Sequence, residues 1–406
     1  MGGVQDQCEV PRVEGRTGEP AGLHIGVIGG GQLGQMLGLA GVAMGHRFTF
    51  LDPAMEPPAA SVGRHLRAEF DDAEALERLA VECDLVTLEF ENVPLASAEL
   101  VAARNCLMPN PQALAVAQDR VEEKQFFEGL GLSVAPWVQV DSVRDIVQGV
   151  AHLGAPAILK TRRFGYDGKG QVRLADPAHA AHEGGPGNPG EAASAWEALA
   201  GAPAVLEKML AFEREVSIVA VRGRDGEARV YPLVTNEHRH GILWQTTAHS
   251  GDPLQADAER AARLVMDKLD YVGVLAIEFF VVDGRLVINE MAPRVHNSGH
   301  WSLGGARTSQ FENHIRAVIG WPLGETDPLG EVAMLNLVGT LPDPAAVLAV
   351  PGTHWHDYGK TPRPGRKLGH VTVTAPDRAA LESRLDQLRA VIRPPETSMA
   401  PGTSGA

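Results

Sequence analysis

Basic residues, cysteines and long apolar runs are scarce in this chain of 406 residues. Lysine and arginine number 36 against 51 acidic residues, and the net charge of −15 argues against duplex nucleic acid as a general partner. The three cysteines lack CxxC spacing, which argues against a zinc site and fits a reducing cytoplasm. No run of about 18 apolar residues occurs, so no membrane-spanning helix is expected. The N-terminal segment also lacks the apolar core of a signal peptide, so none is expected.

Strand-like and helix-like segments alternate in the first part of the chain. A buried strand at 24–28 precedes a glycine-rich turn and a helical run, and a second strand follows at 47–52. This alternation predicts an α/β unit with a parallel sheet and helical crossovers. Strand pairs mixed with helices predict that the remainder is α+β. The polar ends, 1–21 and 394–406, have a composition typical of disorder.

A glycine-rich loop follows the first strand as Gly29-x-Gly31-x-x-Gly34, and Asp52 lies 18 residues beyond it. This spacing satisfies the dinucleotide-binding fingerprint, in which glycines admit a phosphate and the acid binds a ribose. The same helix N-terminus also suits the phosphate of other small ligands, and a tight turn without a ligand is a further alternative. We assign the loop to a substrate, because the rest of the chain predicts a different nucleotide site.

Two acidic residues, Glu278 and Glu290, stand on consecutive apolar strands joined by the turn Asp283-Gly284. Asn289 precedes the second acid. Carboxylate and amide oxygens at the ends of paired strands are ligands that Mg²⁺ prefers when it bridges nucleotide phosphates. A solvent-facing hairpin is the alternative, but Glu278 has apolar neighbours, among which an unpaired carboxylate is costly. The hairpin therefore predicts a magnesium site.

A phosphate-binding region is predicted around Lys160, which ends an apolar strand, and the segment 162–171 that follows. Lys169 within this segment is placed to reach bound phosphates. Three glycines, Gly165, Gly168 and Gly170, are expected to make the segment conformationally flexible. Such a segment can fold over a triphosphate and exclude water as a lid. Asp-Gly is also a strong turn signal, so a simple hairpin is the alternative.

A second feature of the predicted nucleotide site is the apolar strand at 205–210, whose connector can offer backbone hydrogen bonds to adenine. Glu215 is placed to bind ribose hydroxyls and His238 to approach the phosphates. By pattern alone, Glu207, Glu215 and His238 fit ordinary surface positions better.

Several motifs occur in the order expected of one family. They are GGGQLGQM, KTRRFGYDGKGQ, EKML, NEMAPRVHNSGHW, SQFENHIRA and RPGRKLGHV. Between Leu23 and Ile392 the chain resembles the ATP-grasp ligases, and within them the purine-pathway enzymes that carboxylate an aminoimidazole ribonucleotide. The resemblance implies an ATP-grasp fold with a Rossmann-like N-terminal domain at 22–118, a small central lid domain at 119–206, and a mixed α+β C-terminal domain at 207–393.

The resemblance also implies an ATP site between the last two domains. The positions matching this site are Arg120, Lys160, Gly165, Tyr166, Asp167, Gly168, Lys169, Gly170, Gln171, Glu207, Lys208, Met209, Leu210, Glu215, His238, Asn289 and Glu290. Glu278 and Glu290 would hold the metal, expected as two Mg²⁺ ions, with Mn²⁺ as a substitute. The family further suggests a cytoplasmic homodimer whose other partners are small molecules, without nucleic acid or membrane.

The family reaction joins bicarbonate to the 5-amino group of 5-aminoimidazole ribonucleotide, yielding the N5 carbamate, ADP and phosphate. Bicarbonate is a poor electrophile, so its oxygen first takes the γ-phosphoryl group of ATP to give carboxyphosphate. The sequence leaves open whether the amine attacks carboxyphosphate or the CO₂ that it releases. Arg294 is expected to hold the planar oxyanion, and His296 to orient an intermediate or accept a proton. Tyr166 and Lys169 complete the expected catalytic group, and a structural role is the alternative for His296.

The ribonucleotide is expected to bind beside a basic group that stands out in an acidic chain, where Arg363 adjoins Arg366 and Lys367. A surface patch is the alternative. The helix N-terminus after the glycine loop would share the phosphate. Of the two acids after the third parallel strand, Glu89 is expected to contact the amine, with Glu91 as the alternative. The full predicted set is Gln32, Leu33, Glu89, Glu91, Asn297, Ser298, Lys360, Arg366 and Lys367.

Three other interpretations remain open from the sequence. Another ATP-grasp carboxylase or ligase would share the ATP site but not the NSGHW and RPGRK motifs. An NAD-dependent oxidoreductase would use the first glycine loop and would leave Lys160 and the paired acids unexplained. A non-catalytic nucleotide-binding protein is disfavoured, because every polar group expected of the enzyme is present.

Overall fold

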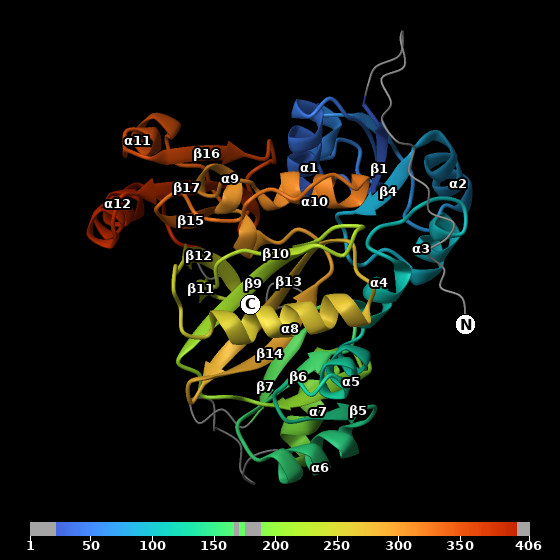
Figure 1. Cartoon of the computed structure of the whole chain (residues 1–406). Coiled ribbons are helices and arrows are strands. Elements are labelled where there is room, and N and C mark those ends of the chain that lie inside the picture. The colour runs from blue at the N-terminus through green and yellow to red at the C-terminus, as the bar shows by residue number, and fades with distance from the viewer. Residues whose placement is uncertain (1–21, 166–169, 175–187, 396–406) are drawn as a thin grey trace, which may run out of the picture.

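Figure 1 shows the fold of the chain as a computed structural model that describes residues 22–165, 170–174 and 188–395. The predicted lid residues Tyr166, Asp167, Gly168 and Lys169 lie outside the described residues. The same holds for the N-terminal extension and for most of the C-terminal tail. Within the described ranges, no helix is long and apolar enough to span a bilayer.

The N-terminal domain is built on a four-stranded sheet in the order β3-β2-β1-β4. Its strands pair in parallel, which confirms the predicted α/β unit. The strands are β1 (His24–Ile28), β2 (Arg47–Leu51), β3 (Arg64–Leu66) and β4 (Leu85–Leu88). The helices are α1 (Gln32–Ala43), α2 (Ala73–Glu82), α3 (Leu95–Ala102) and α4 (Pro111–Gln118), with a 3-10 turn at Pro58–Ser61. The loops after β1 and β4 leave the same edge of the sheet, where open α/β sheets bind ligands.

The central domain begins with α5 (Arg120–Gly129), which Asp119 caps by accepting a hydrogen bond from the backbone N–H of Val121. An antiparallel sheet in the order β5-β8-β6-β7 follows. Its elements are β5 (Trp137–Val140), α6 (Val143–Leu153), β6 (Ala157–Thr161), β7 (Gln171–Leu174), α7 (Pro189–Ala198) and β8 (Ala204–Lys208). Strand β8 continues two residues past the predicted domain boundary at 206, and such offsets are ordinary at element ends.

A nine-stranded, antiparallel sheet dominates the described part of the C-terminal domain. The order is β14-β13-β9-β11-β12-β15-β17-β16, and β10 pairs with β9. The strands are β9 (Arg214–Arg222), β10 (Ala228–Val230), β11 (Val234–Arg239), β12 (Ile242–Ala248), β13 (Gly273–Val282), β14 (Arg285–Ala292), β15 (Glu331–Val338), β16 (Thr353–Asp357) and β17 (Lys367–Ala375). The helices are α8 (Gln255–Lys268), α9 (Ser302–Gly305), α10 (Gln310–Ile319), α11 (Pro344–Leu348) and α12 (Arg378–Val391), and Asn297–Gly299 forms a 3-10 turn.

The N-terminal domain is fixed to the large sheet through α1 and α10, which lie side by side in Figure 1. One apolar core continues from Phe50 in the first domain to Phe311 in α10. Within this contact, the buried His314 accepts from the backbone N–H of Val274 at 3.1 Å and lies 2.8 Å from the Thr87 hydroxyl. Burial lowers the pKa of His314 to about 4, so the ring is neutral and bridges β4 with β13.

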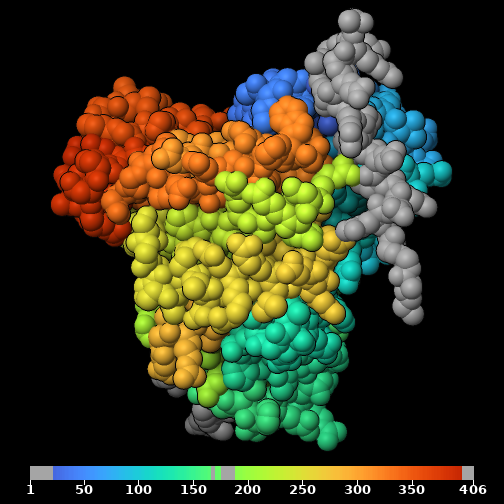
Figure 2. All heavy atoms as spheres, in the orientation of Figure 1, coloured from blue at the N-terminus to red at the C-terminus, as the bar shows by residue number. Residues whose placement is uncertain are grey.

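Figure 2 shows the same arrangement as a surface, with the blue N-terminal domain at the upper end and the teal and green central domain at the lower end. The yellow-green and yellow part of the C-terminal domain lies between them, and its orange and red part lies beside the N-terminal domain at the upper left. The apolar face of α8 packs against the sheet through Val265 and Met266, beside Ile218 and Ile277. The strand ends of all three domains therefore meet around one region of the molecule, and that region holds the predicted site.

Candidate active site

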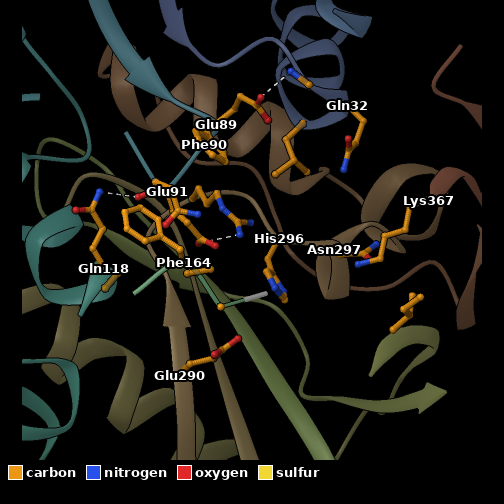
Figure 3. Close-up of a pocket in the computed structure, with 18 of the residues that line it drawn as sticks. Gln32, Glu89, Phe90, Glu91, Gln118, Phe164, Glu290, His296, Asn297 and Lys367 are labelled. Carbon is orange, nitrogen blue, oxygen red and sulfur yellow. Dashed lines mark hydrogen bonds and ion pairs between the residues drawn. The ribbon is translucent and has the colours of Figure 1, made fainter. Parts of the chain in front are cut away.

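A cavity of about 1290 Å³ opens where the three domains meet. Its walls come from the loops after β1 and β4, from the start of α5, and from the segments after β6, β14 and β16. Figure 3 shows Gln32 and Glu89 at one side, Glu290 at the opposite side, and Lys367 with Asn297 at a third. Predicted residues that lie far apart in the sequence therefore line one chamber.

Glu89 occupies the N-terminus of α1. Its carboxylate accepts from the backbone N–H of Gly31 at 2.6 Å, and burial raises the pKa of this acid. Asp52 likewise accepts from the N–H of Gly30 at 2.7 Å and from that of Ala54 at 2.8 Å. Because both acids bind the loop backbone, the fingerprint acid is engaged in the loop itself, and a carboxylate already sits where a dinucleotide phosphate would lie. This argues against the dinucleotide interpretation.

A buried acid lies between two lysines beneath the predicted ATP site. Glu207 is 3% exposed, and its two oxygens lie 3.0 Å from Lys160 Nζ and 3.1 Å from Lys124 Nζ. Burial alone would raise the pKa of Glu207, but the two lysines outweigh burial and lower it to about 2. Burial lowers the pKa of Lys160, whose Nζ also lies 3.4 Å from Asn289 Oδ1. The predicted residues Lys160, Glu207 and Asn289 are thus brought together.

The two predicted metal acids are direct cross-strand partners. Glu278 on β13 pairs with Glu290 on β14, while Phe279 pairs with Ile288, so Asn289 is the extra residue of a β-bulge. A bulge changes the direction of the side chains near it. Because of the bulge, the consecutive residues Asn289 and Glu290 both contact basic side chains. Asn289 contacts Lys160, and Glu290 accepts a hydrogen bond from Arg120 Nη1 at 2.9 Å.

The charge balance of this acid pair fits a divalent cation. Burial and the neighbouring Glu290 raise the pKa of Glu278 to about 7. Burial would also raise the pKa of Glu290, but Arg120 outweighs it and lowers the value. In the described ranges, no group of three or more His, Cys, Asp or Glu side chains forms a metal site. Two carboxylates and an amide instead make a partial oxygen site, which ligand phosphates and water would complete.

A third acid near this pair, Glu123, was missed by the sequence analysis. Glu123 on α5 is 2% exposed and accepts from the backbone N–H of Met291 at 2.7 Å. Burial and Glu290 raise the pKa of Glu123 to about 8. Glu123 and Lys124 follow Val121 and precede Phe127 on the buried side of α5. The available signal in the sequence was that these two charged residues share the helical spacing of the apolar residues that face the core.

Arg294 and His296 follow the end of β14 and line the cavity. Arg294 Nη2 lies 2.7 Å from the Glu91 carboxylate, which comes from the loop after β4. His296 Nδ1 accepts from the backbone N–H of Ser298 at 3.3 Å, so the ring proton is on Nε2, 3.7 Å from Glu278. Burial and Arg294 lower the pKa of His296 well below its usual value. His296 is therefore neutral, and its Nε2–H faces Glu278 from beyond hydrogen-bond distance.

The predicted substrate residues of this loop differ in placement. Asn297 lines the cavity and exchanges hydrogen bonds of 3.1 and 2.9 Å with Asn336. Ser298 is fully buried, and its hydroxyl lies 2.9 Å from His296 Nδ1, so it contacts the histidine rather than the chamber. Gln310 on α10, which the sequence analysis missed, binds both the N–H and the carbonyl of His296, at 2.9 and 2.7 Å.

The basic group after β16 lines a further wall of the cavity. Its Lys360 binds the side chain of Gln32, which brings together two predicted substrate residues separated by more than 300 positions. Burial and the nearby Arg366 lower the pKa of Lys360 to about 8. Leu33, Glu91, Arg363 and Lys367 also line the cavity.

The remaining predicted ATP residues within the described ranges lie on β7, β8, β9 and β11 or in the segments beside β6, β7 and β8. His238 lies 2.6 Å from Glu215; burial alone would lower the pKa of His238, but Glu215 outweighs burial and raises it. The N–H groups of Lys208 and Met209 donate to the carbonyls of Pro136 and Pro156, so they belong to the fold. Three further predicted residues have the following positions: Gly165 lines the cavity, Gln171 begins β7, and Leu210 follows β8. Gly170, before β7, has a positive φ of 70°, which favours glycine.

Comparisons with known proteins agree with this architecture. Residues 23–118 match the ribonucleotide synthetase preATP-grasp domain, residues 125–311 the ATP-grasp domain, and residues 332–384 the phosphoribosylaminoimidazole carboxylase C-terminal domain. The chain is 50% identical to an N5-carboxyaminoimidazole ribonucleotide synthase of Pseudomonas aeruginosa, over 91% of this chain and 99% of that protein.

Solved structures show the same likeness. The N5-carboxyaminoimidazole ribonucleotide synthetase of Thermus thermophilus is 48% identical with a TM-score of 0.84, covering 93% of this chain and all of that one. An Aspergillus clavatus synthase in complex with ADP and 5-aminoimidazole ribonucleotide is 28% identical with a TM-score of 0.81, covering 91% and 98%. With its fold and about nine tenths of its length shared with these proteins, the chain belongs to the N5-carboxyaminoimidazole ribonucleotide synthase family of ATP-grasp enzymes.

Proposed function

We propose that this protein carboxylates the 5-amino group of 5-aminoimidazole ribonucleotide with ATP and bicarbonate, in purine (IMP) biosynthesis. The names of its relatives support this reaction. The observation that carries the proposal is that one cavity contains both the Glu91–Arg294 pair and the Arg120–Glu290 pair. An activated carboxyl group and the amine that accepts it can therefore meet in a single chamber.

ATP would bind at the central domain side of the cavity. Lys160 is held by Glu207, and Arg120 is held by Glu290, so both cations keep a fixed place before the nucleotide arrives. Fixed cations stabilise the charge that develops during phosphoryl transfer without reorganising at that moment. His238 and Glu215 form a paired group that would serve the phosphates and the ribose.

Magnesium would be held by Glu278 and Glu290, with Asn289 beside them. When bound, Mg²⁺ neutralises phosphate charge. The fit rests on the acid pair itself: two half-buried carboxylates are cross-strand partners on β13 and β14, and the pKa of Glu278 is raised to about 7. A cation supplies the positive charge that this pair lacks.

Bicarbonate would lie against Arg294, whose guanidinium is fixed by Glu91 and matches a planar oxyanion. A bicarbonate oxygen attacks the γ-phosphorus of ATP, ADP leaves, and carboxyphosphate forms. The amine then attacks the carboxyl carbon, either in carboxyphosphate or in CO₂ released from it, and phosphate leaves. Because His296 is neutral with its proton on Nε2, we assign it the role of orienting the carboxyl group by donating a hydrogen bond.

The ribonucleotide would bind with its phosphate at the basic group and its amine towards the loop after β4. Lys360, bound to Gln32, and the neighbouring Arg366 and Lys367 supply the positive charge. Because Glu89 already binds the Gly31 amide, we assign the contact with the amine to Glu91 in the first place. Glu91 is also the acid that fixes Arg294, so the amine would arrive beside the carboxyl group.

The test of this function is ADP formation by the purified protein with ATP, Mg²⁺, bicarbonate and 5-aminoimidazole ribonucleotide, each omitted in turn. We expect turnover to fall at least tenfold when either bicarbonate or the ribonucleotide is omitted. Turnover that ignores the ribonucleotide but responds to another amine would identify a different ATP-grasp ligase. A cytoplasmic homodimer also remains our proposal, and sedimentation of the purified protein tests its oligomeric state.

A further inference from the structure

The three consecutive residues between the body of α4 and that of α5 attach to three different domains. Arg120 binds Glu290 of the C-terminal domain at 2.9 Å. Asp119 binds Arg162 of the central domain through both carboxylate oxygens, at 2.8 and 3.1 Å. Gln118, the last residue of α4, binds the N-terminal domain. The domain contacts around the cavity therefore converge on one short segment.

The side-chain amide of Gln118 uses all of its hydrogen-bonding groups. It is 7% exposed, and its Nε2 donates to the carbonyl oxygens of Glu91 and Val93 at 2.8 and 2.5 Å. Its Oε1 accepts from Arg163 Nη2 at 2.7 Å. The opposite amide orientation would place its oxygen against two carbonyl oxygens and its N–H groups against a guanidinium. The contacts therefore fix one orientation of the amide.

These contacts connect two parts of the cavity that carry different substrates in the proposed reaction. Glu91 and Val93 belong to the loop after β4, and the Glu91 carboxylate holds Arg294 at 2.7 Å. Arg163 stands on the segment that leaves β6, two residues before Gly165 in the cavity wall. Figure 3 shows Gln118, Glu91 and Phe164 gathered at the same side of the chamber, with the Gln118 hydrogen bond dashed.

We propose that Gln118 is a positioning residue that couples ATP consumption to carboxylation of the ribonucleotide. It holds the loop after β4 so that Glu91 keeps Arg294 in place, and Arg163 holds the amide in turn. If that loop shifts, Arg294 no longer keeps the activated carboxyl group beside the amine, and ATP is spent without product. This inference rests on the proposed function and adds to it a residue of the cavity wall that acts through Glu91 and Arg294.

The test uses two variants and a matched control in the full-length protein. Gln118→Glu keeps the size of the side chain and the oxygen that accepts from Arg163, but it removes both donors to the loop carbonyls. Arg163→Met removes the donor to the amide at an exposed position, where folding is spared. Arg144→Met removes an arginine that is exposed on α6 and serves as the control. ADP and carboxylated ribonucleotide are measured together, along with the KM of each substrate.

For Gln118→Glu we expect the ribonucleotide KM to rise roughly tenfold, the ATP KM to change less than about twofold, and ADP per product to rise well above one. Arg163→Met should shift the ratio in the same direction by less. The double variant should be no worse than Gln118→Glu, because both changes break one chain of contacts. The control should match the wild type.

A one-to-one ratio of ADP to product in Gln118→Glu, or equal rises in both KM values, would overturn the proposal. If Gln118→Glu does not fold, Arg163→Met decides alone, and a wild-type ratio in that variant overturns it. Failure of the proposed function is a separate result, because the wild-type protein would then form no ADP in response to the ribonucleotide.

Discussion

Replacing Glu207 with glutamine tests the buried charge cluster beneath the ATP site. Glu207 lies between Lys160 and Lys124, at 3.0 and 3.1 Å, and all three side chains are largely buried. The glutamine side chain would have nearly the same shape but would leave two ammonium groups without a counter-charge. Removing one partner of a buried ion pair costs about 3–5 kcal/mol. We expect the variant to lose free energy of unfolding of this order at neutral pH.

The pKa of Glu207 gives an independent value for the same contribution. The pKa falls from 4.5 to about 2 in the folded protein, which corresponds to about 3 kcal/mol of stabilisation. Because the folded pKa is lowered, this stabilisation is complete above the unfolded pKa and is lost as the pH falls towards 2. By pH 3 the wild type should have lost about 2 kcal/mol of it. The variant has no carboxyl group at this position and should not lose that amount.

Urea unfolding followed by circular dichroism, at a series of pH values between 7 and 3, measures both effects. The difference in free energy of unfolding between wild type and Glu207→Gln should be largest at pH 7 and should shrink as the pH falls. Glu122→Gln, at an exposed position on α5, is the matched control and should differ little from wild type at any pH. A difference for Glu207→Gln that stays constant from pH 7 to 3 would refute the reasoning.

Three further changes test other parts of the site. Glu290→Gln should lower ATP turnover at least a hundredfold with an unchanged circular dichroism spectrum, and bicarbonate-dependent turnover near the wild-type rate would contradict the metal assignment. Lys367→Ala should raise the KM of the ribonucleotide roughly tenfold more than that of ATP, and equal effects would move the phosphate site elsewhere. His314→Gln should flatten the pH dependence of stability, because a pKa lowered from 6.5 to about 4 costs the wild type about 3 kcal/mol as the pH falls through that window. If the free energy of unfolding of wild type and of His314→Gln changed equally with pH, the assignment of His314 as a buried neutral bridge would be contradicted.

Local pattern was sufficient for the features that depend on neighbours in the sequence. The alternation of strands and helices predicted the parallel N-terminal sheet, because β1 and β4 are short apolar runs each followed by a helix, whereas the short edge strand β3 was not predicted. The turn Asp283-Gly284 placed Glu278 and Glu290 on adjacent strands, and the structure makes them cross-strand partners. The motif order also gave the family, which the comparisons confirm.

Features that depend on strand register and on the exact contacts of a side chain were beyond the sequence. The bulge at Asn289 shifts the register by one residue, and nothing local reports such a shift. Ser298 looked like a substrate ligand but is buried against His296. Glu89 looked like an amine ligand but first binds the backbone of the glycine loop.

The sequence by itself therefore determined the family, the pairing of Glu278 with Glu290 and the basic group at Arg363, Arg366 and Lys367. Only the tertiary structure decided which charged groups are buried together, as in Glu207 between two lysines, and which amide links the domains, as in Gln118. The physical reason is that a charge or an amide has its energy set by what surrounds it within a few ångströms. At this site those surroundings come from three domains that are far apart along the chain.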